Sequence, residues 1–271
     1  MRIGVIGCAG RMGRANMAEI LATDGLELVG GIEVKGNPAI GEDLGVLAGG
    51  DPIGTKACDD LGSLLTAAHA VIEFSTPDAS LANAERCADA GCAHVIGTTG
   101  LDAGQRARLA ELGKAIPIVW AANMSQGVNL LLGLVERVAR SLDAEFDIEI
   151  VEAHHRHKVD APSGTALALG EAAAAGRGVR LEDVADRGRD GFTGARRPGD
   201  IGFAVMRGGD VIGDHTVLFA GDGERIELTH KASNRSIYSR GAVRAARWAA
   251  SQPPGFYGMI DVLGLNNSPA A

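Results

Sequence analysis

The first 120 residues alternate short apolar segments with longer segments of helical periodicity. The apolar segments are rich in β-branched residues and hydrophobic on both faces, as in strands that lie between two layers of helices. They span residues 2–7, 26–32, 70–74, 92–98 and 116–121. Three of the segments between them place apolar residues three and four positions apart, which predicts amphipathic helices. This alternation predicts an α/β fold with a doubly wound, Rossmann-like parallel sheet.

The character of the sequence changes after an apolar helical segment over residues 125–142. From Phe146 onward apolar and polar residues alternate, and a helix is predicted from about Ser163. Residues 201–232 contain three strand patterns separated by Gly-Gly-Asp and Gly-Asp-Gly, which predict three consecutive antiparallel strands. The changes place domain boundaries near residues 125 and 235.

The formal charge of −8 argues against partners that require a broad basic surface, so we expect neither nucleic acid nor a membrane as a partner. No apolar run approaches the roughly 18 to 20 residues that predict a membrane span. The first residues pass directly into a strand pattern instead of a signal peptide, and the four cysteines form no CxxC pair. We therefore expect a cytoplasmic protein with reduced thiols.

Three glycines, Gly7, Gly10 and Gly13, follow the first predicted strand and open the first predicted helix. Their GxxGxxG spacing is one residue longer at the first gap than the common dinucleotide fingerprint. A turn without side chains still lets a pyrophosphate approach the helix N-terminus, where N–H groups and the helix dipole attract negative charge. The pattern favours a dinucleotide site over the alternative, a simple tight turn.

Glu33 ends the second predicted strand, 20 residues after Gly13. An acid at this place can accept hydrogen bonds from the ribose hydroxyls of a dinucleotide. A carboxylate favours NADH because it repels the 2′-phosphate of NADPH, whereas Lys35 could partly neutralise that phosphate. The predicted cofactor is therefore NADH or NADPH, and the alternative for Glu33 is an ordinary solvated loop acid.

Residues 154–158, His-His-Arg-His-Lys, concentrate three histidines and two cations. Consecutive histidines at a strand end point to opposite faces and no cysteine lies nearby, so no metal site is predicted. The following Pro-Ser-Gly-Thr, 162–165, has the pattern of a helix start with Ser163 as the N-cap. Cations beside a helix N-terminus favour a small dicarboxylate substrate, and a histidine there could also transfer a proton. A solvated basic loop is the alternative.

Five motifs together resemble the 4-hydroxy-tetrahydrodipicolinate reductase family, also called dihydrodipicolinate reductase, of the diaminopimelate and lysine pathway. They are spread over nearly the whole chain, and the long histidine motif is highly specific. The motifs are GxxGRMG at 7–13, GTTG at 97–100, AANMSQGVN at 121–129, EAHHRHKVDAPSGTA at 152–166 and THKASNR at 229–235.

The resemblance implies a dinucleotide-binding domain over residues 1–125, to which residues 235–271 return. Residues 126–234 would form a smaller α+β domain whose open mixed sheet serves substrate binding and assembly of a homotetramer. The implied reaction is the reduction of (2S,4S)-4-hydroxy-2,3,4,5-tetrahydrodipicolinate by NADH or NADPH, with loss of water. A reductase of another small imino or keto dicarboxylate and a non-catalytic NADH-sensing module are the alternatives.

The resemblance also implies residue roles. His154 and Lys158 would be catalytic, and His155, Gly164 and Thr165 would contact the substrate. The cofactor would be held by Gly7, Cys8, Ala9, Gly10, Arg11, Met12, Gly13, Glu33, Gly97, Thr98, Thr99, Ala121, Ala122, Asn123 and Met124.

Two positions depart from the family pattern. Val34 follows the ribose acid where the family often has a basic residue, which weakens the case for a well-held 2′-phosphate. Met124 stands where the family often has phenylalanine, so a flexible thioether replaces a flat ring beside the expected nicotinamide.

Overall fold

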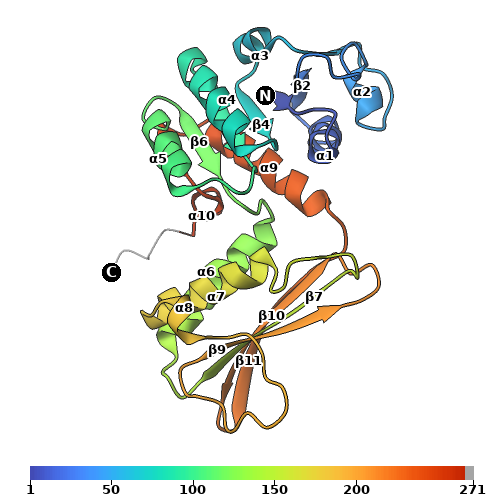
Figure 1. Cartoon of the computed structure of the whole chain (residues 1–271). Helices are drawn as coiled ribbons and strands as arrows, with labels where there is room; N and C mark the ends of the chain where they lie inside the picture. Colours follow the sequence, from blue (N-terminus) through green and yellow to red (C-terminus); the bar gives the residue numbers. More distant parts are fainter. Residues whose placement is uncertain (266–271) are drawn as a thin grey trace. The chain divides into compact units, whose positions relative to one another are not determined.

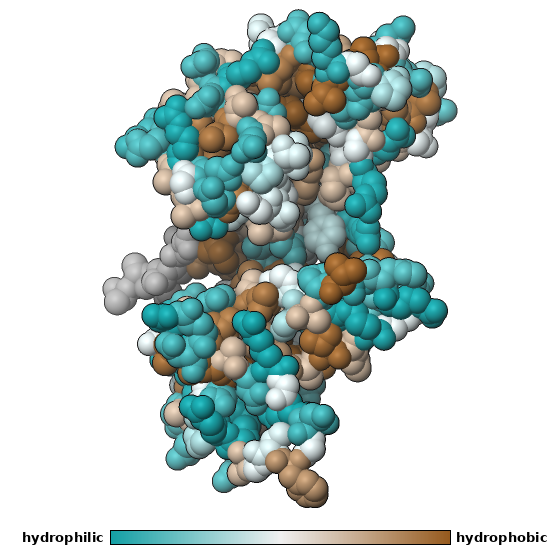
Figure 2. Space-filling model, viewed as in Figure 1, coloured by the Kyte–Doolittle hydropathy of each residue, from teal (hydrophilic) through white to brown (hydrophobic). Residues whose placement is uncertain are grey.

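The computed structural model describes residues 1–265, which form two compact units. Unit 1 consists of Met1–Gln126 together with the chain from Ser236 onward, and unit 2 consists of Gly127–Arg235. On the face shown in Figure 2, hydrophilic side chains cover much of each unit and apolar ones lie among them.

Unit 1 is built on a seven-stranded parallel sheet with the order β12-β6-β5-β4-β1-β2-β3. The strand order reverses direction at β1, as expected of a doubly wound sheet, so this prediction is confirmed. The strands are β1 (Arg2–Ile6), β2 (Glu27–Ile32), β3 (Ala57–Cys58), β4 (Ala70–Glu73), β5 (Ala93–Ile96), β6 (Pro117–Trp120) and β12 (Gly255–Tyr257).

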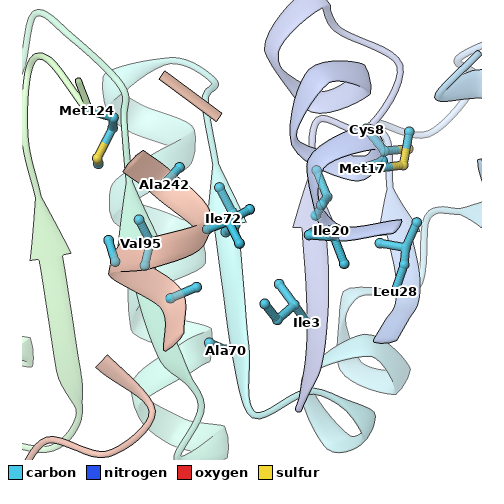
Figure 3. Close-up of a cluster of buried hydrophobic side chains, with 14 of the residues drawn as sticks. Ile3, Cys8, Met17, Ile20, Leu28, Ala70, Ile72, Val95, Met124 and Ala242 are labelled. Atoms are coloured by element: carbon cyan, nitrogen blue, oxygen red, sulfur yellow. The ribbon is translucent and has the colours of Figure 1, made fainter. Parts of the chain in front are cut away.

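Helices cover both faces of this sheet (Figure 1). Apolar side chains of β1, β4 and β5 pack on one face against α1 and α9, in the core drawn in Figure 3. The other face packs against α3, α4 and α5. The helices of unit 1 are α1 (Arg11–Leu21), α2 (Leu44–Leu47), α3 (Leu61–Ala67), α4 (Pro77–Ala90), α5 (Ala103–Leu112), α9 (Ser236–Ala249) and α10 (Met259–Val262).

The ends of these helices follow local sequence signals. Helix α4 has Pro77 in its first turn and ends at Gly91, which has a left-handed φ of 70°. Helix α5 begins with a capping box, in which Asp102 and Gln105 each bond the other's backbone N–H. The predicted long strands and helices of this unit are confirmed, while the short α2, α3, β3 and β12 were not predicted.

Unit 2 has a five-stranded mixed sheet with the order β11-β10-β7-β9-β8. Its strands are β7 (Asp147–His154), β8 (Ala185–Asp186), β9 (Ile201–Arg207), β10 (Gly213–Gly221) and β11 (Glu224–Ala232), and its helices are α6 (Gln126–Ser141), α7 (Gly164–Arg177) and α8 (Leu181–Val184). Strand β7 alternates strictly between buried and half-buried positions. Its buried residues Ile148 and Ile150 pack in one core with Leu131 of α6 and Leu169 of α7.

The prediction that residues 201–232 form three consecutive antiparallel strands is wrong in one part. Strands β10 and β11 do form an antiparallel hairpin, but β7 lies between β9 and β10 and pairs in parallel with β9. The loop after β9 crosses the end of β7, where Gly208 N–H bonds His154 O and His155 N–H bonds Val211 O. A central strand whose residues lie 53 positions before their partners on β9 satisfies the edge hydrogen bonds that a local hairpin would have used.

Candidate active site

The glycine turn joins β1 to α1 through backbone contacts alone. Gly7 has a left-handed φ of 73°, and its N–H bonds Ile32 O on the neighbouring strand. A Cβ on Gly13 would lie 2.0 Å from Gly7 O, so the turn and the helix approach each other closely only because Gly13 lacks a side chain. Gly10 is the N-cap of α1 and makes no side-chain cap. Arg11, Met12 and Gly13 thus present backbone N–H groups at a helix start suited to an anion.

Glu33 lies beside this turn at the end of β2. Its Oε1 accepts a hydrogen bond from Ala9 N–H at 2.7 Å, and its Oε2 accepts one from Asn37 Nδ2 at 2.9 Å. The carboxylate is therefore held against the glycine turn, as expected of an acid that receives ribose hydroxyls. Val34 beside it is 74% exposed, and Lys35 is also exposed.

A cavity of about 1170 Å³ opens in front of the turn and Glu33. Such a volume accommodates a large ligand, because pockets for drug-sized molecules measure roughly 300 to 1,000 Å³. The basic side chains in its wall are Arg14, Lys35 and Arg86, and the acidic ones are Glu33, Glu42 and Asp59. The glycine turn, the uncapped helix start and this cavity together fit a dinucleotide.

The other predicted cofactor residues of unit 1 differ in what they can offer. Burial raises the pKa of the Cys8 thiol to about 11, and the fully buried side chain lies in the core, so only its backbone faces the turn. Thr98 is likewise buried, and its Oγ1 accepts hydrogen bonds from Ser75 N–H and the Ser80 hydroxyl. Gly97 packs directly on Phe74, whose ring would lie 2.2 Å from a Cβ there. Thr99 is exposed.

The segment after β6 bends between the sheet and α9. Ala122 is exposed, whereas the Met124 side chain is only 1% exposed and points into the core of unit 1 (Figure 3). A Cβ on Gly241 of α9 would lie 1.7 Å from Met124 O, so α9 packs on the backbone here. Ala121 and Met124 are both buried, so a cofactor would contact their backbone atoms and not their side chains.

In unit 2, Glu152 is the buried centre of the histidine motif. Its side chain lies on the core face of β7, two residues before His154 and therefore on the same face. Glu152 Oε1 accepts hydrogen bonds from Ser163 N–H at 3.0 Å and Arg207 Nη2 at 2.9 Å, and Oε2 accepts one from Arg207 Nη1 at 2.8 Å. Burial alone would raise the pKa of Glu152, but the hydrogen bonds from Arg207, His154 and Ser163 hold it below its usual value.

His154 lies at the end of β7 and is 8% exposed. Its Nδ1 is 2.5 Å from Glu152 Oε2. The ring of His215, from β10, meets it edge to face with 5.0 Å between the ring centroids. Burial, followed by the positive charge of His154, lowers the pKa of His215 to about 4, so His215 is neutral near pH 7. The His154 ring therefore lies beside an imidazole that is neutral near pH 7.

The helix start predicted at Ser163 is confirmed. Ser163 is the N-cap of α7, and its Oγ accepts a hydrogen bond from Ala166 N–H and contacts His215 Nε2 at 3.1 Å. Gly164 and Thr165 form the first turn of the 14-residue α7. Because Ser163 and His154 both bond Glu152, the structure brings the histidine and the helix start to one place.

The loop after β7 carries the remaining predicted residues. Lys158 Nζ forms an ion pair with Asp160 Oδ1 at 2.8 Å, which lowers the pKa of Asp160. Arg207 Nη2 also bonds Asp160 O, so the guanidinium that holds Glu152 ties down this loop. The His155 ring lies 6.3 Å from that of His157. Among residues 1–265, no group of three or more metal-ligating side chains is arranged to hold a metal, and no helix is long and apolar enough to cross a membrane.

Comparison with known proteins decides the family. The sequence matches the family model described as "Dihydrodipicolinate reductase, N-terminus" over residues 1–124, and "Dihydrodipicolinate reductase, C-terminus" over residues 127–263. The chain belongs to the dihydrodipicolinate reductase family. The family and the fold imply a nicotinamide cofactor.

Curated members of this reductase family match almost the whole chain. Proteins named 4-hydroxy-tetrahydrodipicolinate reductase are 53% identical in Ruegeria sp. (strain TM1040) and 56% identical in Dinoroseobacter shibae (strain DSM 16493 / NCIMB 14021 / DFL 12), each over 97% of this chain and 98% of the relative. The solved structure "Dipicolinate bound Dihydrodipicolinate reductase from Paenisporosarcina sp. TG-14" has a TM-score of 0.77 at 24% identity, over 96% of this chain and 98% of that chain. At this identity the structural match supports the fold.

Three residues around His154 were not predicted from the sequence: Glu152, Arg207 and His215. Glu152 had a usable signal, because a residue two positions before a histidine on a strand shares its face. Arg207 and His215 are 53 and 61 positions away from His154, on strands whose pairing with β7 is set by the tertiary fold.

Proposed function

We propose that this member of the dihydrodipicolinate reductase family reduces (2S,4S)-4-hydroxy-2,3,4,5-tetrahydrodipicolinate to 2,3,4,5-tetrahydrodipicolinate with loss of water, in lysine and diaminopimelate biosynthesis. Relatives with this reductase name share 53 to 56% of its residues over nearly full length. The observation that carries the proposal is the meeting of His154 and the α7 start at Glu152, because it supplies a proton-transfer group beside a carboxylate site.

In this proposal His154 and Lys158 are the catalytic residues. The bound nicotinamide supplies hydride to C4 of the substrate ring. Once the 4-hydroxyl and a C5 proton have left as water, hydride added at C4 of the resulting C4=C5–C6=N system would place negative charge on C5 and the ring nitrogen, and His154 is the acid placed to neutralise it. Lys158 exchanges its ion pair with Asp160 for a substrate carboxylate and serves as a second proton donor. His155, Gly164 and Thr165 bind the other polar groups of the substrate.

The proposed cofactor site of unit 1 comprises the glycine turn, Glu33, residues 97–99 and residues 121–124. Glu33 favours NADH, while Lys35 and Arg86 in the cavity wall offer charge to a 2′-phosphate, so we propose that both NADH and NADPH are used. Michaelis constants for the two cofactors, measured beside those of Val34→Arg, test this. The arginine should lower the Michaelis constant for NADPH and not that for NADH. An unchanged ratio of the two constants would contradict the proposed position of the adenosine ribose beside Glu33 and Val34.

We also propose that unit 2 assembles the chain into a homotetramer through the sheet face opposite α6 and α7. The strand register puts Val151, Ala204, Met206 and Leu218 on that face, and Met206 is 58% exposed. Light scattering after size exclusion should give four times the chain mass, and Met206→Glu should lower it. A wild-type monomer would contradict this assembly. We propose that the protein acts in the cytoplasm, and cell fractionation tests this.

A spectrophotometric assay tests the reaction itself. Oxidation of NADH or NADPH should depend on the freshly made aldol product of pyruvate and aspartate semialdehyde, and dipicolinate should inhibit it. Turnover with other imino or keto dicarboxylates alone would indicate a different reductase. Tight NADH binding without turnover of any such substrate would indicate a sensor and contradict the proposal.

A further inference from the structure

The imidazole of His154 is fixed to the protein by one nitrogen. Nδ1 lies 2.5 Å from Glu152 Oε2, whereas Nε2 bonds no protein group within residues 1–265. A Cβ on Gly213 would lie 3.0 Å from Nε2, so the glycine at the start of β10 leaves the space beside this nitrogen open. The ring thus has one nitrogen bonded to the protein and one that, within residues 1–265, has no protein partner.

The state of Glu152 decides which nitrogen of His154 carries a proton. The carboxyl is 1% exposed and accepts from Arg207, Ser163 and His154, and its pKa lies below the usual value. An ionised carboxylate has only acceptor capacity. His154 must therefore donate Nδ1–H to it, which leaves Nε2 as the nitrogen that gains and loses a proton.

His215 does not compete for this role. Its Nε2 contacts Ser163 Oγ, and burial keeps the ring neutral near pH 7. Its ring edge fills the space next to His154 without adding a second positive charge, which would oppose protonation of His154. Glu152 is accordingly the charged group in direct contact with the His154 ring.

We propose that Glu152 is the positioning residue of His154: it fixes the Nδ1–H form, directs Nε2 to the substrate, and stabilises the protonated ring. This rests on the proposed function, in which His154 is the acid. Arg207 holds Glu152 through two parallel hydrogen bonds and also bonds Asp160 O, next to the Lys158 loop. One buried carboxylate therefore sets the positions of the acid, the α7 start and, through Arg207, the lysine loop.

The proposal predicts the direction in which the pH dependence of turnover changes. Charged or titratable groups around His154 come from every element packed near it: Glu152 on β7, Arg207 on β9, His215 on β10, His230 on β11, and His155, Lys158 and Asp160 in the loop after β7. Removing the negative charge of Glu152 leaves Arg207 unpaired beside the ring. Both changes disfavour the protonated imidazole. As the pH rises, the variant should therefore lose activity at a lower pH than the wild type does.

The experiment compares Glu152→Gln with the matched control Glu149→Gln. Glu149 lies on the same strand but the opposite face, where Arg189 and Arg196 bond it, so this variant also removes a carboxylate held by arginine. For Glu152→Gln, kcat should fall at least about 10-fold, up to the roughly 10² to 10⁴ expected for loss of a general acid. The pH of half-maximal kcat should drop by about 1 to 3 units. Glu149→Gln should leave the profile in place.

Nitrogen-15 NMR of histidine-labelled protein gives a readout independent of turnover. The His154 signals, assigned by difference with His154→Gln, should show a protonated Nδ1 and a titrating Nε2 in the wild type, and a loss of this preference in Glu152→Gln. This readout separates failure of the positioning role from failure of the proposed reaction. A wild-type His154 with unprotonated Nδ1, or a Glu152→Gln profile that coincides with the wild type, would overturn the proposal.

Arg207→Lys keeps the proposal testable if Glu152→Gln does not fold. Lysine retains the charge but cannot bond both carboxylate oxygens in parallel. We expect an intermediate loss of kcat with the pH profile close to that of the wild type, because Glu152 remains charged. A folded Arg207→Lys protein with wild-type kcat and wild-type His154 signals would show that the position of Glu152 does not matter.

Discussion

Each unit contains a buried carboxylate and imidazole pair, and the two pairs differ in what surrounds them. In unit 1, Glu73 at the end of β4 lies 2.8 Å from Nε2 of His94 on β5, and both side chains are fully buried. Asn83 Nδ2 and the Ser75 hydroxyl complete the bonds to Glu73. In unit 2, Glu152 is just as buried, but Nε2 of His154 bonds no protein group within residues 1–265.

Under the proposed function, what surrounds each pair, more than its chemistry, separates the structural role of Glu73 and His94 from the catalytic role of His154. Burial alone would lower the pKa of His94, but Cys87 and Glu73 raise it to about 10, so the ring stays charged near pH 7 and contributes to stability. His154 has the same kind of partner, and its Nε2 bonds no protein group within residues 1–265. We therefore expect changes at Glu73 to affect folding and changes at His154 to affect turnover.

Replacing His154 by glutamine is expected to have the largest effect. His154→Gln removes the proposed acid while keeping a polar side chain, so kcat should fall by about 10² to 10⁴. Steady-state kinetics and a fluorescence titration with NADH measure the two properties separately. An equal loss of NADH affinity would contradict the assignment, because His154 lies in unit 2 and the proposed cofactor residues lie in unit 1.

Replacing Glu73 should give the opposite pattern. Glu73→Gln leaves a buried imidazolium without its counter-charge, which should lower the free energy of unfolding by about 3 to 5 kcal/mol. The kcat per folded molecule should be retained. Urea unfolding measures the loss, with Glu85→Gln as control, since Glu85 pairs with Arg108 at the surface and should contribute about 1 kcal/mol or less. A stable but inactive Glu73→Gln protein would contradict the structural role assigned to the Glu73 and His94 pair.

The pH dependence of stability also tests the structural role of the Glu73 and His94 pair. The folded pKa of His94 is raised from 6.5 to about 10, so its contribution is fully present below about pH 6.5 and is lost as the pH rises toward 10. The free energy of unfolding should fall over this range in the wild type and less steeply in Glu73→Gln. Urea titrations at several pH values measure how the free energy of unfolding changes with pH in each protein. Equal slopes in the two proteins would show that His94 is not the cause.

A smaller effect is expected at the glycine turn, where the site consists of backbone. Gly13→Ala puts a Cβ against Gly7 O and Cys8 Cα, which should cost about 1 to 3 kcal/mol of stability and weaken NADH binding. Gly50→Ala is the control, because the nearest atom to its Cβ is 3.8 Å away. NADH titration and thermal unfolding measure both. A wild-type affinity of Gly13→Ala for NADH would show that the turn does not contribute to cofactor binding.

The fold of unit 1 could be predicted because its signals are local. Buried parallel strands appear as short apolar runs, and the glycine turn lies within seven residues. In unit 2 the strands β7 and β10 were predicted, but the position of β7 between β9 and β10 was not, since the pairing of distant strands is not set by the turn sequences. The short β12 carries only three residues and has too little periodicity to be recognised.

The site could be predicted only as far as its residues lie together in the sequence. His154 and Ser163 are nine positions apart, and the strand and helix-start signals around them placed both correctly. The reason that they meet is Glu152, held by Arg207 on β9. That contact arises from the parallel register of β7 and β9, in which His154 lies opposite Arg207. It could not be predicted from either strand's sequence alone.

Adding dipicolinate to histidine-labelled protein, and following the imidazole signals of both pairs, tests the contrast most directly. Dipicolinate is the ligand named for the solved relative from Paenisporosarcina sp. TG-14. The His154 signals should shift on titration while the His94 signals stay in place. Shifts confined to His94, or a His154 ring indifferent to saturating dipicolinate, would contradict the claim that the Glu152 and His154 pair faces the substrate.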